Sequence, residues 1–252
     1  MRLPATLLSV LALATLGACA SKPPTDPEAL AEYRQTNDPY ESTNRVFYAF
    51  NNGVDRFVFK PVAQAYRYVV PGTVRRPVHN ALANITSPVL FANDVMQGKP
   101  RRAGDTAMRF LINTTVGVGG LFDVAQGWGY PAHSSDFGMT LALWGVSGGP
   151  YLFLPVLGPS NPRDTAGFGG DIVLDPLTFA GYPYSNAVGY SRYGVGAVDA
   201  RERVLDQLDE INRTALDPYA TIRSLAVQHR QSEIDNARQD NAATVPAWFL
   251  HR

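Results

Sequence analysis

The pentapeptide at residues 145–149, GVSGG, comes closest to the residue types of a catalytic site. It matches G-x-S-x-G, in which a serine on a sharp turn between a strand and a helix is the nucleophile of α/β-hydrolases. The residues that could complete a triad in the correct chain order are Asp171, Asp175 or Asp199, and then His229. However, Pro150 and a further apolar run follow the motif where that fold requires a helix. An esterase or phospholipase using Ser147 is therefore our alternative prediction.

Other patterns offer less. Residues 117–120, GVGG, are similar to a phosphate-binding loop, but Phe122 stands where a dinucleotide-binding fingerprint has a glycine. The four His are scattered and no metal-ligand spacing occurs, so we expect no metal and no small-molecule cofactor. A few charges are isolated within apolar sequence, and we predict that they are paired structural residues: Asp123, Asp136, Arg163 and Asp164.

Cys19 is the only cysteine of the chain, and the residues before it predict a modification. An apolar run over residues 7–16 is too short to cross a bilayer and is typical of a secretory signal peptide. Residues 16–19, LGAC, resemble the bacterial lipobox, whose cysteine is acylated after cleavage. We predict a signal peptide over 1–18 and a covalent lipid on Cys19. Since Ala20 follows the cysteine, resemblance to lipoprotein sorting signals favours the outer membrane of a Gram-negative cell, with the chain on the periplasmic side.

Charge excludes one class of partner. The 252 residues carry 22 basic and 22 acidic side chains, with no basic stripe. Duplex binding requires Lys and Arg in excess to neutralise phosphates, so we expect no nucleic-acid partner.

The elements that would position these residues begin after a polar linker, predicted over 19–37. Asp38 is predicted to cap a helix that ends before Pro61. Its apolar residues repeat at helical spacing, which indicates either core packing or a helix lying in a membrane interface. The candidates for membrane contact are Phe47, Phe50, Val54 and Phe57. Further helices are predicted from Val74 towards Pro88, over a short segment at 89–96, and over 101–116.

The stretch from 117 to 158 contains ten glycines in 42 residues and only two charges, so protein or lipid must shield it from water. Two apolar runs, at 139–144 and 151–157, flank a glycine-rich turn and predict a hairpin-like excursion. The candidates for lining or gating a passage are Gly117, Gly119, Gly120, Gly145, Gly148, Gly149 and Pro150.

The C-terminal part is more charged. Residues 199–216 predict one water-exposed amphipathic helix, and Asp217-Pro218 starts another. We predict a folded unit over 38–230 and a disordered polar tail over 231–252.

Longer runs resemble one family, the MlaA/VacJ outer-membrane lipoproteins. The similar runs are DPYESTNR (38–45), KPVA (60–63), RFLINTTVGVGGLFDVA (109–125), DFGMTLALWG (136–145), GPYLFLPVLGPS (149–160) with Arg163-Asp164, and DPYATIR (217–223). Small departures occur at Thr43, Met139 and Ala142.

The resemblance implies a mainly α fold: one ring-shaped helical domain with amphipathic helices in the membrane plane and a Gly-rich hairpin-like segment. It also implies a non-enzymatic function, in which an amphipathic channel removes mislocalised phospholipid from the outer leaflet and maintains lipid asymmetry. The implied partners are a trimeric porin and a soluble, MlaC-like periplasmic phospholipid carrier linked to an inner-membrane ABC transporter.

Overall fold

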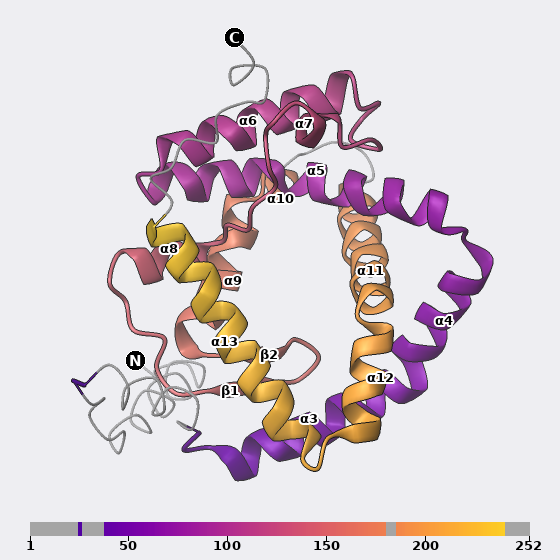
Figure 1. Ribbon diagram of the computed structural model, residues 1–252, viewed down its shortest axis with the longest axis vertical. Helices are drawn as coiled ribbons and strands as arrows, with labels where there is room; N and C mark the ends of the chain where they lie inside the picture. Colours follow the sequence, from indigo (N-terminus) through magenta and orange to yellow (C-terminus); the bar gives the residue numbers. More distant parts are fainter. Residues whose placement is uncertain (1–24, 27–37, 180–184, 240–252) are drawn as a thin grey trace, which may run out of the picture.

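The computed structural model describes residues 25–26, 38–179 and 185–239. The predicted signal peptide, Cys19 and nearly all of the predicted linker lie outside these residues. Within them, consecutive helices run around a ring, interrupted by one short hairpin (Figure 1). The predicted mainly α, ring-shaped domain is therefore confirmed. No helix in the described ranges is both long and apolar enough to span a membrane.

The ring begins with a helical run that bends without breaking. It comprises α3 (Glu41–Val54), the π-helix η2 (Asp55–Phe59) and α4 (Lys60–Val69). The prediction that the helix ends before Pro61 is wrong, because Pro61 lies in the first turn of α4 and the wider π turn precedes it. In that turn Lys60 N donates to the Asp55 carbonyl, five residues back, where an α-helix would bond four residues back. Asp38 does not cap α3; its carboxylate has other partners.

One long helix then replaces the two segments predicted between 74 and 96. α5 spans Gly72–Met96 and continues through both Pro77 and Pro88, although a proline inside a helix costs about 3 kcal/mol. α6 (Pro100–Thr115), where the sequence predicted a helix, lies along α5. Asn84 Nδ2 donates to Thr114 Oγ1 and Thr106 Oγ1 donates to Asp94 Oδ2, which fixes the two helices antiparallel.

The glycine-rich stretch folds differently from the prediction. Its first predicted arm is helical, because Asp136 caps α8 (Phe137–Leu143) by accepting a hydrogen bond from Met139 N. The short helix α7 (Val124–Gly127) precedes it. The hairpin lies later in the chain, where β1 (Leu152–Leu154) pairs antiparallel with β2 (Gly158–Ser160).

The C-terminal half closes the ring. Its helices are α9 (Pro162–Leu174), α10 (Pro176–Phe179), α11 (Ser185–Arg203), α12 (Leu205–Thr214) and α13 (Pro218–Gln239). The single exposed helix predicted over 199–216 is wrong, since the chain breaks at Val204. Asp199, Arg201 and Glu202 are buried because they pair with groups on α5, η2 and α4.

The predicted disordered tail is wrong for residues 231–239. α13 continues to Gln239, and Ile234 and Ala237 pack against Met139 and Ala142 of α8. This small cluster and one around Tyr219 are the main apolar clusters of the described chain. Residues 240–252 lie outside the described residues.

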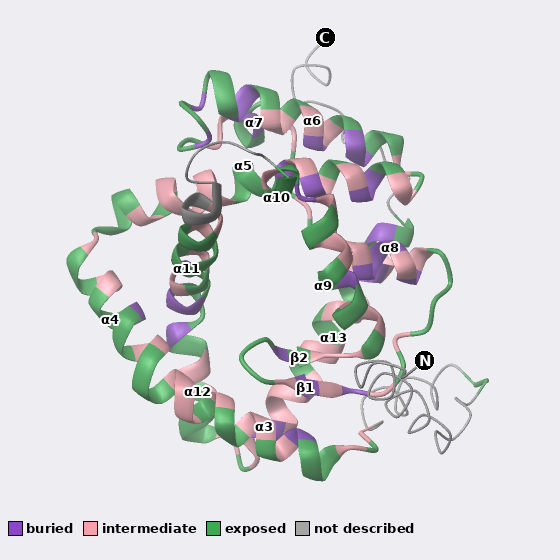
Figure 2. Cartoon of the chain, turned by 180° about the vertical axis from the view of Figure 1, so that it is seen from behind, coloured by how far each residue is buried: buried purple, intermediate pink, exposed green. Residues whose placement is uncertain are grey.

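Few residues of the ring are buried (Figure 2), and large apolar side chains are exposed more often than hydrophobic ones are buried. Among the described residues 13 hydrophobic side chains are buried, whereas 32 large hydrophobic ones are exposed. Soluble monomers rarely expose large contiguous apolar patches. The described part of the fold therefore exposes many large apolar side chains.

Candidate functional site

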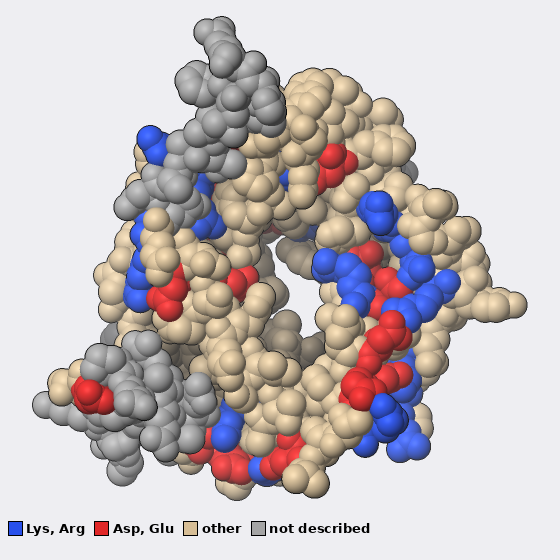
Figure 3. Space-filling view, viewed as in Figure 1, with Lys and Arg blue, Asp and Glu red and all other residues tan. Residues whose placement is uncertain are grey.

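The most conspicuous feature of the fold is an opening through the middle of the ring (Figure 3). α11 lies on one side of it and α9 and α13 on the other, with α5 closing a third side (Figures 1 and 2). α9 and α11 both carry exposed large apolar side chains, which are Phe168, Ile172, Val173, Tyr190, Tyr193 and Val195. Figure 3 also shows alternating acidic and basic side chains over the α11–α12 side. The helices around the opening therefore carry both exposed apolar side chains and charged ones.

The turn between β1 and β2 reaches into this opening (Figures 1 and 2). Val156 and Leu157 in the turn are both exposed, and Val156 adopts a φ of 67°, which is rare for a β-branched residue. The Val156 amide donates to Asn51 Oδ1 (2.8 Å), and Asn51 Nδ2 donates to the Leu154 carbonyl (2.9 Å). A side chain of α3 thus holds the tip in a strained conformation, with apolar groups presented to the opening.

The polar face of α3 points into the protein. Asn44, seven residues before Asn51 and so on the same helix face, is 2% exposed. Its Oδ1 accepts a hydrogen bond from Phe153 N (2.8 Å), and its Nδ2 donates to the Tyr151 carbonyl (3.1 Å). These two asparagines therefore dock the hairpin on α3.

The apolar face of α3 and η2 points outwards as a result. Phe50 is exposed and Phe57 is 78% exposed, whereas Val54 is half-buried. Phe47 differs, since it packs against the cluster of Tyr151, Phe153 and Tyr219. Of the two interpretations of this helix, core packing applies to Phe47, whereas membrane contact by the exposed Phe50 and Phe57 stays a prediction.

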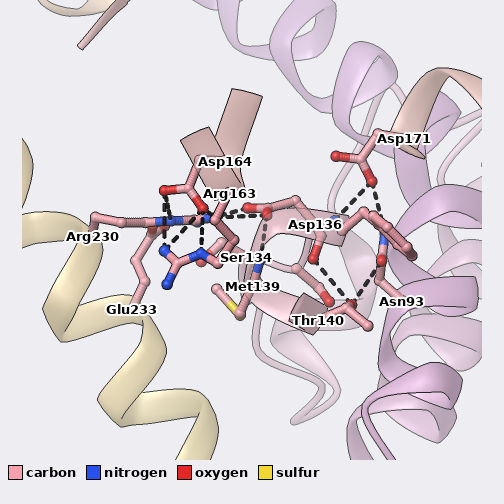
Figure 4. Close-up of polar contacts among 12 residues, drawn as sticks. Asn93, Ser134, Asp136, Met139, Thr140, Arg163, Asp164, Asp171, Arg230 and Glu233 are labelled. Carbon is pink, nitrogen blue, oxygen red and sulfur yellow. Dashed lines mark hydrogen bonds and ion pairs between the residues drawn. The ribbon is translucent and has the colours of Figure 1, made fainter. Parts of the chain in front are cut away.

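Arg230 joins α13 to α8 and α9 (Figure 4). From α13 its guanidinium makes two 2.7 Å hydrogen bonds to Asp136, the cap of α8, and two 3.0 Å bonds to Asp164 of α9. Burial alone raises the pKa of Asp164, but hydrogen bonds and charge from Arg230 and Arg163 outweigh burial and hold this pKa below its usual range. Asp136, Asp164 and Arg163 are thus paired structural residues, as predicted, and Asp123 pairs likewise with Arg109.

Contacts beside this cluster extend it to α5. Asp171 of α9 accepts from Asn93 Nδ2 (2.8 Å) and from Phe137 N (3.0 Å), and burial raises the pKa of its carboxyl. α8 and α9 cross where a Cβ on Gly167 would lie 2.3 Å from the backbone nitrogen of Gly138. Glycine at this crossing allows the two backbones to touch.

A second cluster closes the ring between the two ends of the described chain. The Asp38 carboxylate accepts hydrogen bonds from Tyr219 Oη and from Arg223 Nη1 (2.9 Å), and Arg45 makes a bidentate pair with Asp217. Burial and the bond to Asp38 raise the pKa of Tyr219. The two Asp-Pro-Tyr runs of the sequence, at 38–40 and 217–219, therefore meet in space.

The glycine candidates lie away from the opening or have packing roles. A Cβ on Gly117 would be 2.3 Å from the Phe122 carbonyl oxygen, and one on Gly120, with φ 91°, would be 2.5 Å from Asn84 Cβ. With Gly119 they form a tight turn between α6 and α7. Gly145, Gly148, Gly149 and Pro150 lie in the loop from α8 to β1, which runs along the outer side of the ring (Figure 1).

The alternative catalytic residues do not form a triad. Ser147 is exposed, and the structure gives the acids other partners: Asp171 binds Asn93, Asp175 binds Arg192, and Asp199 binds His79. His229 is 77% exposed and lies beside Glu233. The described residues also contain no cluster of three metal-ligating side chains.

Sequence reasoning missed the residues that hold the ring and its tip together. Arg230 gave no signal beyond being one charge in a charged helix, and Asn44 and Asn51 lie on the polar side of the predicted helix, opposite its apolar residues. The two asparagines are seven residues apart and so lie on one face of the helix, and this spacing was the available signal. It is compatible with a polar face that points into the protein as well as with one that points to solvent.

Comparisons with known proteins agree with this architecture. A family model described as MlaA lipoprotein matches residues 36–233. The chain is 35% identical over 228 residues to the intermembrane phospholipid transport system lipoprotein MlaA of Escherichia coli K12, covering 88% of this chain and 86% of that protein. The Haemophilus influenzae protein of the same name is 32% identical over 245 residues, covering 94% and 93%. An uncharacterized protein of Rickettsia bellii is 37% identical over 202 residues, covering 80% and 78%.

A solved structure shares the fold. It comes from work on the structural basis for maintenance of bacterial outer membrane lipid asymmetry, and it superposes with a TM-score of 0.67 at 31% identity, covering 79% of this chain and 98% of that one. The chain belongs to the MlaA lipoprotein family.

Proposed function

We propose that phospholipid passes through the opening of this ring, leaving the outer leaflet of the outer membrane for the periplasm. The observation that carries the proposal is the opening itself, in a ring whose outer helices expose apolar side chains. Lipid contact would shield the outer face, and irregular backbone is tolerated at membrane depth where protein or a water-filled cavity covers it. The names of the relatives, which refer to phospholipid transport, support the same substrate.

The tip between β1 and β2 is our candidate for the element that meets lipid. Val156 and Leu157 are apolar and exposed. Acyl chains can move past such side chains without losing apolar contact. The charged α11–α12 side of the ring suits phospholipid headgroups. We therefore propose that the tip, and not the segment Gly145–Pro150, acts as the gate.

The remaining parts of the proposal come from the family resemblance. A lipid on Cys19 would anchor the chain to the outer membrane, a trimeric porin would lie beside the ring, and a soluble MlaC-like carrier would receive the lipid. The step requires no bond making, so we propose that the protein is not an enzyme.

The test is outer-leaflet phospholipid, measured by phospholipase accessibility on intact cells of a deletion strain. Wild-type protein should lower the signal, and Leu157→Arg should not, because a charge in the opening opposes the passage of acyl chains. Leu216→Arg is the matched control, since Leu216 is fully exposed in the turn between α12 and α13. Equal complementation by both variants, with equal protein levels, would contradict the route.

A further inference from the structure

A cavity of about 350 Å³, lined mostly by residues of polar types, lies away from the hairpin tip, between α5, α6 and the segment around α7. Of its 14 lining residues only Ala83, Leu90 and Ala132 are apolar. The others are His79, Asn80, Asn84, Thr86, Ser87, Thr106, Arg109, Asn113, Asp123, Gln126 and His133. Its volume lies within the usual range for small-molecule sites, about 300–1,000 Å³. The amides and hydroxyls of the lining can bond to a polar group of a ligand, which an acyl chain does not offer.

The charges of the wall balance. Arg109 and Asp123 lie side by side, with Arg109 Nη2 2.9 Å from Asp123 Oδ2. Each histidine of the wall lies beside a carboxylate that also pairs with an arginine. His79 Nδ1 is 3.1 Å from Asp199, which pairs with Arg203, and His133 Nε2 is 2.9 Å from Asp94, which pairs with Arg102. A ligand with excess charge would leave that charge uncompensated, whereas one cation and one anion can align with the Arg109–Asp123 pair.

The rim of the cavity is apolar. Residues 116–122, directly before Asp123, carry exposed Val116, Val118, Leu121 and Phe122. Asn80 of the cavity wall donates from Nδ2 to the Leu121 carbonyl (3.1 Å), which holds this rim against the cavity. A cavity with an ion pair, amides and hydroxyls in its lining, beside an apolar rim, fits a molecule with one polar and one apolar end.

We infer that this cavity is a second lipid site, which takes the zwitterionic phosphate–ammonium headgroup of a phospholipid while the acyl chains lie on residues 116–122. The ammonium aligns with Asp123 and the phosphate with Arg109. The inference rests on the proposed function in that the chain meets phospholipid, and it adds a preference for net-neutral headgroups at a place separate from the hairpin tip.

The test is calorimetric titration of the full lipidated protein in detergent with dihexanoyl phosphatidylethanolamine and, separately, dihexanoyl phosphatidylglycerol. We expect the zwitterionic lipid to bind at least about tenfold more tightly. Ala83→Leu fills the cavity without removing a polar group, and it should weaken that binding by at least about tenfold. Ala65→Leu, on an exposed position of α4, should bind as the wild type does.

Equal affinity for the two lipids, or unchanged binding by a folded Ala83→Leu variant, would overturn the site. If Ala83→Leu does not fold, Gln126→Leu replaces it, because Gln126 is exposed at the cavity, and unchanged binding by that variant would overturn the site equally. Failure of the proposed function would be seen in the cell assay and not in the titration: cells carrying Leu157→Arg would have normal outer-leaflet phospholipid.

Discussion

Replacing Arg230 by Gln should destabilise the ring more than the loss of any exposed ion pair. Arg230 bridges Asp136 and Asp164 with four hydrogen bonds of 2.7–3.0 Å, and its side chain is 19% exposed. Glutamine is neutral and shorter than arginine, so Asp136 would lose the cation that pairs with it, and Asp164 would keep only Arg163.

The expected loss of stability follows from the burial of the ion pairs that Arg230 makes. Breaking a buried ion pair from one side costs about 3–5 kcal/mol, because the remaining charge is desolvated. For a protein of this length 1 kcal/mol corresponds to about 2–4 °C, so the melting temperature should fall by about 6–20 °C. Arg213→Gln is the control, since the Arg213–Glu210 pair is largely exposed and is worth about 1 kcal/mol or less.

Thermal unfolding of the purified lipoprotein in detergent, followed by circular dichroism, measures both variants. A cycle with Asp164→Asn and the double variant isolates the coupling between Arg230 and Asp164. An Arg230→Gln melting temperature equal to that of Arg213→Gln would refute our account of how α8, α9 and α13 are held together.

Three further predictions concern other parts of the chain. Asn44→Ala should destabilise the protein by about 2–3 kcal/mol, because it leaves the Phe153 amide without its acceptor, and denaturant unfolding measures this. Ser147→Ala should retain full activity in the outer-leaflet assay; loss of activity in a folded variant would favour the hydrolase alternative. Asp164 has a lowered pKa in the folded state, so its contribution is present above the unfolded pKa of about 3.9 and is lost as pH falls through the folded value. The stability difference between wild type and Asp164→Asn should therefore shrink below about pH 4, and a constant difference down to pH 2 would contradict the pairing.

The sequence was most informative where local rules decide the structure. The helix at 100–115 follows from periodicity, and the start of α13 follows from Asp217-Pro218. The pairing of Asp136 and Asp164 was foreseen because a charge in apolar sequence needs a partner. Family resemblance, and not periodicity, predicted the ring.

Tertiary packing explains why the predictions for α5 and for residues 139–143 were wrong. α5 continues through Pro88 because α6 lies along it, which outweighs the local cost of the proline. Residues 139–143 form a helix and not a strand because Asp136 caps them and because glycines at 138 and 167 let α9 pack closely. Local propensity carries no information about these packing partners, α6 and α9.

The position of the hairpin at the candidate site also depends on a partner that is distant in sequence. Its tip is positioned by Asn51, more than 100 residues away in sequence, so the glycine-rich turn at 145–150 looked like the better gate. The orientation of α3 was equally hidden, because an amphipathic pattern separates two faces without saying which one points outwards.

The most direct test of the central claim is photo-crosslinking with p-benzoylphenylalanine installed at Leu157 in living cells, followed by mass spectrometry of the crosslinked protein. The same group at Leu216, in the exposed turn between α12 and α13, serves as the control. If lipid passes through the ring, phospholipid will be crosslinked at position 157 and not at 216. Phospholipid absent from 157, with the variant folded and in the outer membrane, would contradict passage through the opening.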